Sequence, residues 1–291
     1  MTTQSITSGQ EKQYKRFVED AAEKALKEVG LDKDGLQKLI ENGDEFQARI
    51  ITGIRELSVS NQFSDEERES SYVYPKGYKP KPLEEQISIL RSYWPKIEPG
   101  KNIIQLERKP LIVGAEAPFV IVKWYALAPS YNDGLEKEIL PAIKTQCKGN
   151  FYNWREGKLG EQYLRQHERT AKKLQVLGDQ QKDYDILVVP VQFGLRHRGR
   201  SVRRAREVFT ANEFGLGAFE IGCMLLTHPE RLVSYDDLWI DCAGNEYGPG
   251  ADGDFSDAPF FDFGVGEVGF GADWFGHARS GYSSASGFLP Q

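Results

Sequence analysis

The strongest chemical signal in this sequence is a cluster of arginines. Six arginines and one histidine occupy the eleven residues 196–206, and no acidic residue lies among them. A guanidinium group is planar and can hold a phosphate or a carboxylate through two parallel hydrogen bonds. The cluster therefore indicates that an anion is bound. The residues that we expect to contact it are Arg196, Arg198, Arg200, Ser201, Arg203 and Arg204.

The elements around this cluster would position it for anion binding. Residues 185–191 form a short apolar run typical of a buried strand, although Pro190 favours an edge position or a strand end. A helix is predicted over about 202–209, with Ser201 at its start. The N–H groups at the start of a helix carry partial positive charge and attract anions. We therefore expect either a small phosphate site or part of a nucleic-acid-binding surface.

The same arginines also have a purely structural interpretation. Charge clusters often form a solvated helix face whose members pair with acidic residues elsewhere in the fold. The chain has a formal net charge of −6 and a sequence pI near 5.5, which weakens the case for nucleic acid without excluding a local basic patch. The sequence leaves both interpretations open.

Residues 232–278 have the opposite character, with ten carboxylates and neither lysine nor arginine. Aromatic residues alternate with these carboxylates, which argues against plain disorder, so we expect a packed region that could cover the arginine cluster. Within it, Asp252, Asp254 and Asp257 only superficially resemble a calcium loop. Asp257 stands where a turn glycine is needed, and Phe263 stands where the final bidentate glutamate is needed. We predict no metal site and no cofactor.

Other candidate residues carry weaker signals. Glu220 stands alone among apolar residues, where burial would raise its pKa and suit it to acid or base chemistry. We favour instead a position in solvent or a pairing with an arginine. Cys242 could act as a nucleophile with His228 as its base, but nothing in the sequence places the two together.

The periodicity of apolar residues predicts the elements that must position these groups. We expect an α+β fold, with a helical segment at 1–58, a Pro/Tyr-rich linker or strap at 59–82, and an α+β core at 83–291 that becomes irregular, Gly-rich and acidic from about 232. Helices are predicted over 8–30, 35–41, 44–57, 83–93, 134–146, 158–177 and 213–227. Strands are predicted over 103–106, 111–113 and 119–127.

Composition places the chain in a broad class. The 291 residues are enough for a sizeable core, and three cysteines without CxxC spacing argue against a disulfide scaffold. The polar start lacks the layout of a signal peptide, and no apolar run is long enough to span a bilayer. We therefore expect a cytoplasmic protein that does not enter a membrane.

Several stretches of the chain resemble one group of proteins. The stretch FGLGAFEIGCMLLTHPERL, which runs into SYDDLWIDCAGNEY, resembles a recurrent block in predicted proteins of uncultivated bacteria. The ending SASGFLPQ and the opening SGQEKQYKRFVEDAAEKALKEVGL are similar to the same group, so the resemblance covers most of the chain. That group has no assigned activity, fold or site residues, and the resemblance implies no function.

Together these patterns predict a non-enzymatic cytoplasmic binding protein whose arginine cluster engages an anionic partner, with nucleic acid as the leading candidate. The acidic region could mask the cluster. One alternative is an enzyme for a phosphorylated or acidic small molecule, in which Asp241, Asp252 and Asp254 supply acid–base or metal chemistry. Another is a scaffolding protein that self-associates through its N-terminal helices.

Overall fold

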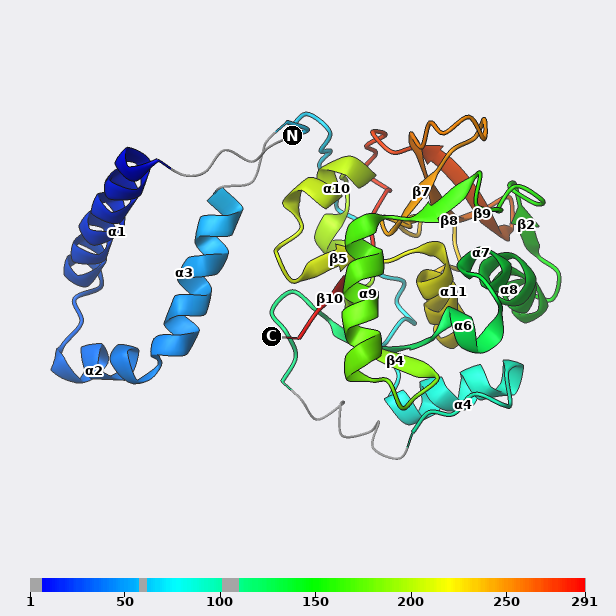
Figure 1. The fold of residues 1–291 in the computed structure, drawn as a ribbon, viewed down its shortest axis with the longest axis horizontal. Helices are drawn as coiled ribbons and strands as arrows, with labels where there is room; N and C mark the ends of the chain where they lie inside the picture. The colour runs from blue at the N-terminus through cyan, green and yellow to red at the C-terminus, as the bar shows by residue number, and fades with distance from the viewer. Residues whose placement is uncertain (1–6, 58–61, 101–109, 291) are drawn as a thin grey trace. The chain divides into compact units, whose positions relative to one another are not determined.

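The computed structural model describes residues 7–57, 62–100 and 110–290 (Figure 1). The chain forms two compact units, Met1–Ser58 and Val59–Gln291. None of the helices within the described ranges is both long and apolar enough to cross a membrane. The strand predicted over 103–106 lies outside the described residues.

The N-terminal unit consists of three helices: α1 (Ser8–Val29), α2 (Lys33–Glu41) and α3 (Gly43–Leu57). Gly30 ends α1 because its φ of +61° lies in the left-handed region that glycine adopts readily. Asp32 caps α2 by accepting a hydrogen bond from the N–H of Gly35 at 2.7 Å. Large apolar side chains of these helices are exposed, since Phe17 is 62% exposed and Ile40 is 64% exposed. Self-association through these helices stays a prediction.

An antiparallel sheet of four strands runs through the second unit. Its spatial order is β1 (Ala117–Val122), β4 (Ile186–Gln192), β10 (Ser286–Phe288) and β5 (Glu213–Gly215). The predicted buried strand is β4, but the edge position that Pro190 suggested is wrong. Pro190 is tolerated inside the sheet because it lies opposite Pro118 on β1, while β10 pairs only with the next two residues, Val191 and Gln192.

Helices cover this sheet and fill the space beside it. α11 (Ala218–Thr227) is buried along its whole length and packs against β1 and α4 (Leu83–Tyr93). α9 (Glu168–Gln180) contacts β4 and β5. After β1 the chain forms α6 (Trp124–Leu127), α7 (Tyr131–Asp133), the π-helix η1 (Gly134–Ile139) and α8 (Leu140–Gln146).

A second sheet contains most of the acidic region. Its order is β2 (Phe151–Asn153), β9 (Glu267–Trp274), β8 (Asp257–Gly264), β7 (Asn245–Tyr247) and β3 (Leu164–Gln166), and β6 (Ile240–Asp241) pairs with β8. The C-terminal region therefore holds more regular structure than its glycine content predicts. It also supplies β10 to the first sheet, so it is part of the core and not an appendage.

The fold is α+β, as predicted, although several boundaries differ. Residues 111–113 form no strand, and the strand predicted over 119–127 ends at Val122, where α6 follows. The segments 158–177 and 213–227, both predicted as helices, each contain a short strand, β3 and β5, before α9 and α11 start. The apolar run 213–227 continues across the junction between β5 and α11, so its composition does not mark the junction.

Residues 62–82 follow a fixed path along the second unit. The hydroxyls of Tyr74 and Tyr78 donate to the two carboxylate oxygens of Glu116, each at 2.6 Å. Near the end of the segment, the N–H of Lys81 donates to Nε2 of His228 at 2.9 Å. These bonds to elements far away in the sequence hold the segment in place. The start of the segment is held separately, because the N–H of Arg68 donates to the carbonyl of Gly199 at 2.8 Å and the N–H of Ser201 to the carbonyl of Glu66 at 3.1 Å. These bonds position Glu66 and Glu67 against the arginine cluster.

Candidate anion-binding site

The arginine cluster lies on the turn η2 (Leu195–His197), the loop after it and the helix α10 (Val202–Val208). Ser201 caps α10, because its hydroxyl accepts the N–H of Arg204 at 3.0 Å. The N–H of Arg203 donates to the carbonyl of Phe275 at 3.1 Å. The predicted helix start is therefore confirmed, but acceptors of the protein itself already occupy these two N–H groups.

Carboxylates of the fold surround the helical arginines. Arg203 forms a bidentate ion pair with Glu66, whose pKa is lowered because bonds from Arg203 and Ser201 outweigh the effect of burial. Arg204 is buried and lies 2.5 Å from Glu67 and 2.8 Å from Glu207. Buried guanidiniums of this kind are retained in a fold when their donors are matched.

The loop arginines also have internal partners. Nε of Arg200 lies 3.2 Å from Glu67, and Nε of Arg196 lies 3.3 Å from Glu213. Arg198 donates to the carbonyl of Tyr72 at 3.0 Å. Each arginine that the sequence nominated for anion binding therefore contacts an acceptor within the second unit.

The acids that face the cluster do not come from the region that the sequence suggested. Among the described ion pairs, the partners of these arginines are residues 66, 67, 207 and 213, and none lies within 232–278. The acidic region contributes aromatic rings instead. The guanidinium carbon of Arg203 lies 4.9 Å and 5.4 Å from the ring centres of Trp274 and Phe275.

The carboxylates of the acidic region are not gathered into one site. Asp241 is buried on β6, where burial and the neighbouring Asp273 raise its pKa well above the usual range. Asp252 and Asp254 are exposed on a turn, and Asp257 begins β8. Within the described ranges, no group of three His, Cys, Asp or Glu side chains is arranged to hold a metal ion.

The residues considered for nucleophilic chemistry have other roles. His228 accepts the N–H of Lys81, and its other ring nitrogen lies 2.8 Å from the hydroxyl of Thr227. Burial raises the pKa of Cys242 well above its usual value, so the thiol stays protonated. The pairing of Cys242 with His228 as nucleophile and base therefore lacks the thiolate that it requires.

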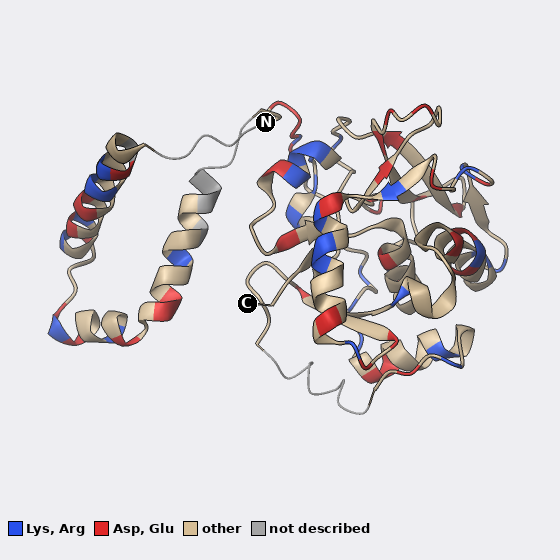
Figure 2. Ribbon diagram, in the orientation of Figure 1, with Lys and Arg blue, Asp and Glu red and all other residues tan. Residues whose placement is uncertain are grey.

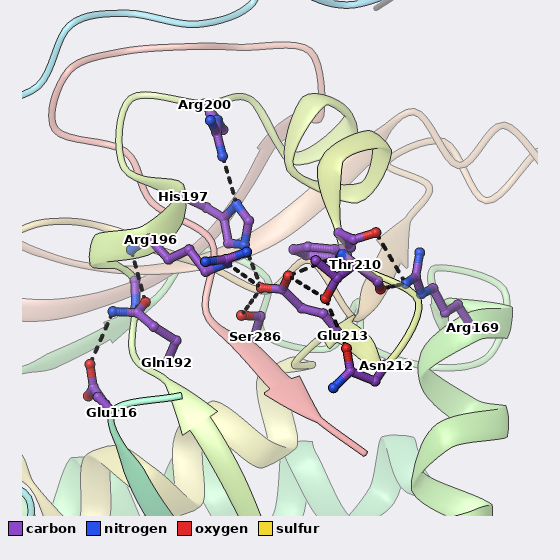
Figure 3. A network of polar contacts seen from close by, with 12 residues as sticks. Glu116, Arg169, Gln192, Arg196, His197, Arg200, Thr210, Asn212, Glu213 and Ser286 are labelled. Atoms are coloured by element: carbon purple, nitrogen blue, oxygen red, sulfur yellow. Dashed lines mark hydrogen bonds and ion pairs between the residues drawn. The ribbon is translucent and has the colours of Figure 1, made fainter. Parts of the chain in front are cut away.

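Glu213 on β5 is the centre of a buried polar network (Figure 3). One of its oxygens lies 2.7 Å from Nε2 of His197 and accepts the hydroxyl of Ser286 at 2.7 Å. Burial alone would raise the pKa of Glu213, but His197, Arg196 and Ser286 outweigh it and lower the pKa to about 2. The network joins the arginine loop to β5 and β10, so Glu213 has a structural role.

A hollow of about 310 Å³ lies beside the network, between the start of α9 and α10. Two arginines in its lining, Arg206 and Arg169, differ from the carboxylate-paired arginines above because main-chain carbonyls, and not carboxylates, accept their hydrogen bonds. Arg206 donates to the carbonyls of Ala243 and Asn245 at 2.9 Å and 2.5 Å, and burial lowers its pKa to about 10. Arg169 donates to the carbonyl of Thr210, as Figure 3 shows, and burial lowers its pKa too. Within the described part of the chain, neither has a carboxylate at ion-pair distance.

A wider groove of about 700 Å³ adjoins this hollow, because His167 and Arg169 line both. The groove also contains Arg165, which pairs with Glu246 at 2.7 Å, and further basic residues of α9. Figure 2 shows lysines and arginines on α10 and on the first half of α9. The two cavities together form a region with more cations than carboxylates, which suits an anion.

Sequence reasoning missed the arginine on α9. It assigned 158–177 to one helix and gave the basic residues there no role. A signal was present, because Arg165, His167, Arg169, Lys172 and Lys173 fall within nine residues that contain only one acid. Their position next to Arg206 depends on the packing of α9 beside β5 and could not be predicted.

Comparisons with known proteins give no further guide to this site. A scan against models of protein families finds no match, and searches of the curated proteins and of the solved structures find no significant match.

Proposed function

We propose that this chain is a non-enzymatic binding protein of the cytoplasm whose partner places an anionic group in the hollow between α9 and α10. The observation that carries this proposal is the pair Arg169 and Arg206, which line the same hollow without a carboxylate at ion-pair distance in the described residues. The carboxylate in that lining, Glu207, pairs with Arg204. A desolvated cation without a counter-charge is costly, and a phosphate or carboxylate would supply that charge. The three free cysteines support a reducing compartment.

The size of the hollow favours a small anion. About 310 Å³ lies at the lower end of the range for small-molecule sites, so a phosphate or carboxylate on a compact organic body would fit. Main-chain carbonyls accept hydrogen bonds from Nη2 of Arg169 and from Nε and Nη2 of Arg206. Each guanidinium has five N–H donors in total. Donors therefore remain for a bidentate contact.

Nucleic acid, the leading candidate from the sequence, has less support. A nucleic-acid surface needs exposed cations that neutralise successive phosphates, whereas Arg203 and Arg204 are paired with carboxylates. The groove beside α9 carries further cations, among them Lys172. An oligonucleotide is therefore included in the test as the alternative partner.

The test is calorimetric titration of the intact chain with pyrophosphate, adenosine monophosphate and a short single-stranded oligonucleotide, at low and moderate salt. Arg206→Met and Arg169→Met remove the two cations of the hollow. Arg198→Met is the matched control, because Arg198 belongs to the cluster but does not line the hollow. Circular dichroism melting establishes that each variant is folded.

We expect a small phosphate to bind, and each hollow variant to weaken it by at least about tenfold, the usual worth of a charge-assisted contact. Arg198→Met should bind like the intact chain. An equal loss in all three variants, or no binding of any small anion at low salt, would overturn the proposal. Steeply salt-dependent binding of the oligonucleotide alone would favour nucleic acid as the partner instead.

A further inference from the structure

A second cavity lies on the other side of α9 and differs in character. It has a volume of about 400 Å³ and is bounded by β1, α6, α9 and the start of α11. Apolar side chains such as Ile121, Leu174 and Leu187 form much of its wall, and the aromatic residues Trp124 and Tyr125 also line it. A cavity of this size and lining is typical of a site for a small organic molecule.

Two charged residues in this lining are buried, Lys123 and Glu220, and Glu220 lies in the first turn of α11. Its side chain is almost fully buried, because the residue is only 2% exposed. Its oxygen Oε2 lies 3.1 Å from the hydroxyl of Tyr131, and that hydroxyl lies 3.1 Å from the side-chain oxygen of Asn245. Within the described residues, no cation lies at ion-pair distance from Glu220. Burial raises its pKa to about 7.

The charges around the cavity are more negative than positive. The ammonium of Lys123 donates to the carbonyl of Gln181 at 2.7 Å and lies 5.8 Å from the ring centre of Tyr125. Burial lowers the pKa of Lys123 because its effect outweighs that of the nearby aspartates. The acids near this wall are Asp179, Asp183, Asp185 and Glu220, and the bases are Lys123 and the exposed Lys182.

We propose that this cavity binds an organic amine, with the ammonium group against Glu220 and an aromatic or aliphatic body between α9 and the rings of α6. The ammonium supplies the counter-charge that Glu220 lacks, and the body replaces water along apolar walls. Aromatic rings in the lining add an attraction for a cation. This site is independent of the proposed anion site, although Gln166 lines both this cavity and the basic groove.

Amine binding is linked to the protonation of Glu220. Where Glu220 carries a proton, the carboxyl loses it to the buffer when the ammonium binds, and an ion pair replaces the neutral acid. Amine affinity should therefore rise with pH between 6 and 8, and one proton should be released where the acid was neutral. The other titratable groups facing the cavity are Lys123, Tyr125, Asp179 and Lys182, with Tyr131 beside Glu220.

The experiment compares phenethylamine with its neutral counterpart 2-phenylethanol, by calorimetry on the intact chain at several pH values. Glu220→Gln keeps the shape of the side chain and removes its charge. Gly178→Phe fills the cavity, since a Cβ on Gly178 would meet only the hydroxyl of Tyr125, at 3.9 Å. Val176→Phe is the matched control, because Val176 lies on the same helix, is 40% exposed and does not line the cavity.

We expect the amine to bind at least about tenfold more tightly than the alcohol at pH 8, and this preference to vanish in Glu220→Gln. Gly178→Phe should abolish binding of both compounds, and Val176→Phe should leave binding unchanged. Equal affinity for amine and alcohol in the intact chain would overturn the proposal. So would amine binding that survives Gly178→Phe, or no binding at pH 8.

Discussion

Two buried glutamates in this protein respond to burial in opposite ways. Glu213 on β5 and Glu220 on α11 are seven residues apart in the sequence and are 0% and 2% exposed. The pKa of Glu213 is lowered to about 2, whereas the pKa of Glu220 is raised to about 7. Burial raises the pKa of both groups, so the difference comes from their partners.

The partners differ in charge. Glu213 faces the ring of His197, the guanidinium of Arg196 and the hydroxyl of Ser286, all of which favour a carboxylate. Glu220 has the hydroxyl of Tyr131 and main-chain N–H groups, which do not compensate for lost hydration. The comparison shows that a buried carboxyl becomes structural where the fold supplies a cation, and becomes a candidate ligand group where it does not.

The two groups affect stability in opposite pH ranges. Glu213 has a folded pKa below its ordinary value of 4.5, so its contribution is present above pH 4.5 and is lost as pH falls toward 2. Glu220 has a folded pKa above 4.5, so its contribution is present below pH 4.5 and is lost as pH rises through 7.

The largest effect is expected for Glu213→Gln. Removing the carboxylate leaves the guanidinium of Arg196 and the buried ring of His197 without their acceptor charge, which should cost about 3 kcal/mol of unfolding free energy at pH 7. Chemical denaturation of the variant and the intact chain measures this difference. A loss below about 1 kcal/mol would mean that the charges of Arg196 and His197 contribute little to holding Glu213 ionised. The contrast between Glu213 and Glu220 would then have another cause.

An intermediate effect, with the opposite sign, is expected for Glu220→Gln. At pH 8 the variant should be more stable than the intact chain by roughly 1–3 kcal/mol, because an uncompensated buried charge has been replaced by an amide. At pH 5, where Glu220 is neutral, the two proteins should have nearly equal stability. A stability difference that does not change between pH 5 and pH 8 would contradict the raised pKa.

The smallest effects are expected when one hydroxyl is removed from each glutamate. Ser286→Ala and Tyr131→Phe should each cost about 1 kcal/mol, the usual worth of one hydrogen bond. Both changes should raise the pKa of the glutamate that loses its donor. Acid unfolding should then begin at a higher pH in Ser286→Ala, and the decline in stability of Tyr131→Phe, which starts near pH 4.5, should continue to a higher pH than in the intact chain. Titration of unfolding free energy against pH checks both shifts.

The sequence predicted part of this arrangement. The apolar neighbours of Glu220 indicated that burial could raise its pKa, but the preferred outcome, exposure or an arginine partner, was wrong. The helix start at Ser201 and the apolar run of β4 followed from local patterns, because helix initiation and continuous burial involve nearby residues. Glu213 gave no signal, since its partners lie sixteen residues before it and on β10.

The sequence by itself determined the α+β class, the helices of the N-terminal unit and the concentration of arginines at 196–206, because these depend on periodicity and composition. Tertiary structure decided which charges would be neutralised. The segment 62–82 brings Glu66 and Glu67 to the cluster, whereas packing of α9 beside β5 leaves Arg169 and Arg206 without such partners. Charge compensation acts through space over a few ångströms, and residues more than a hundred positions apart meet only when the chain has folded.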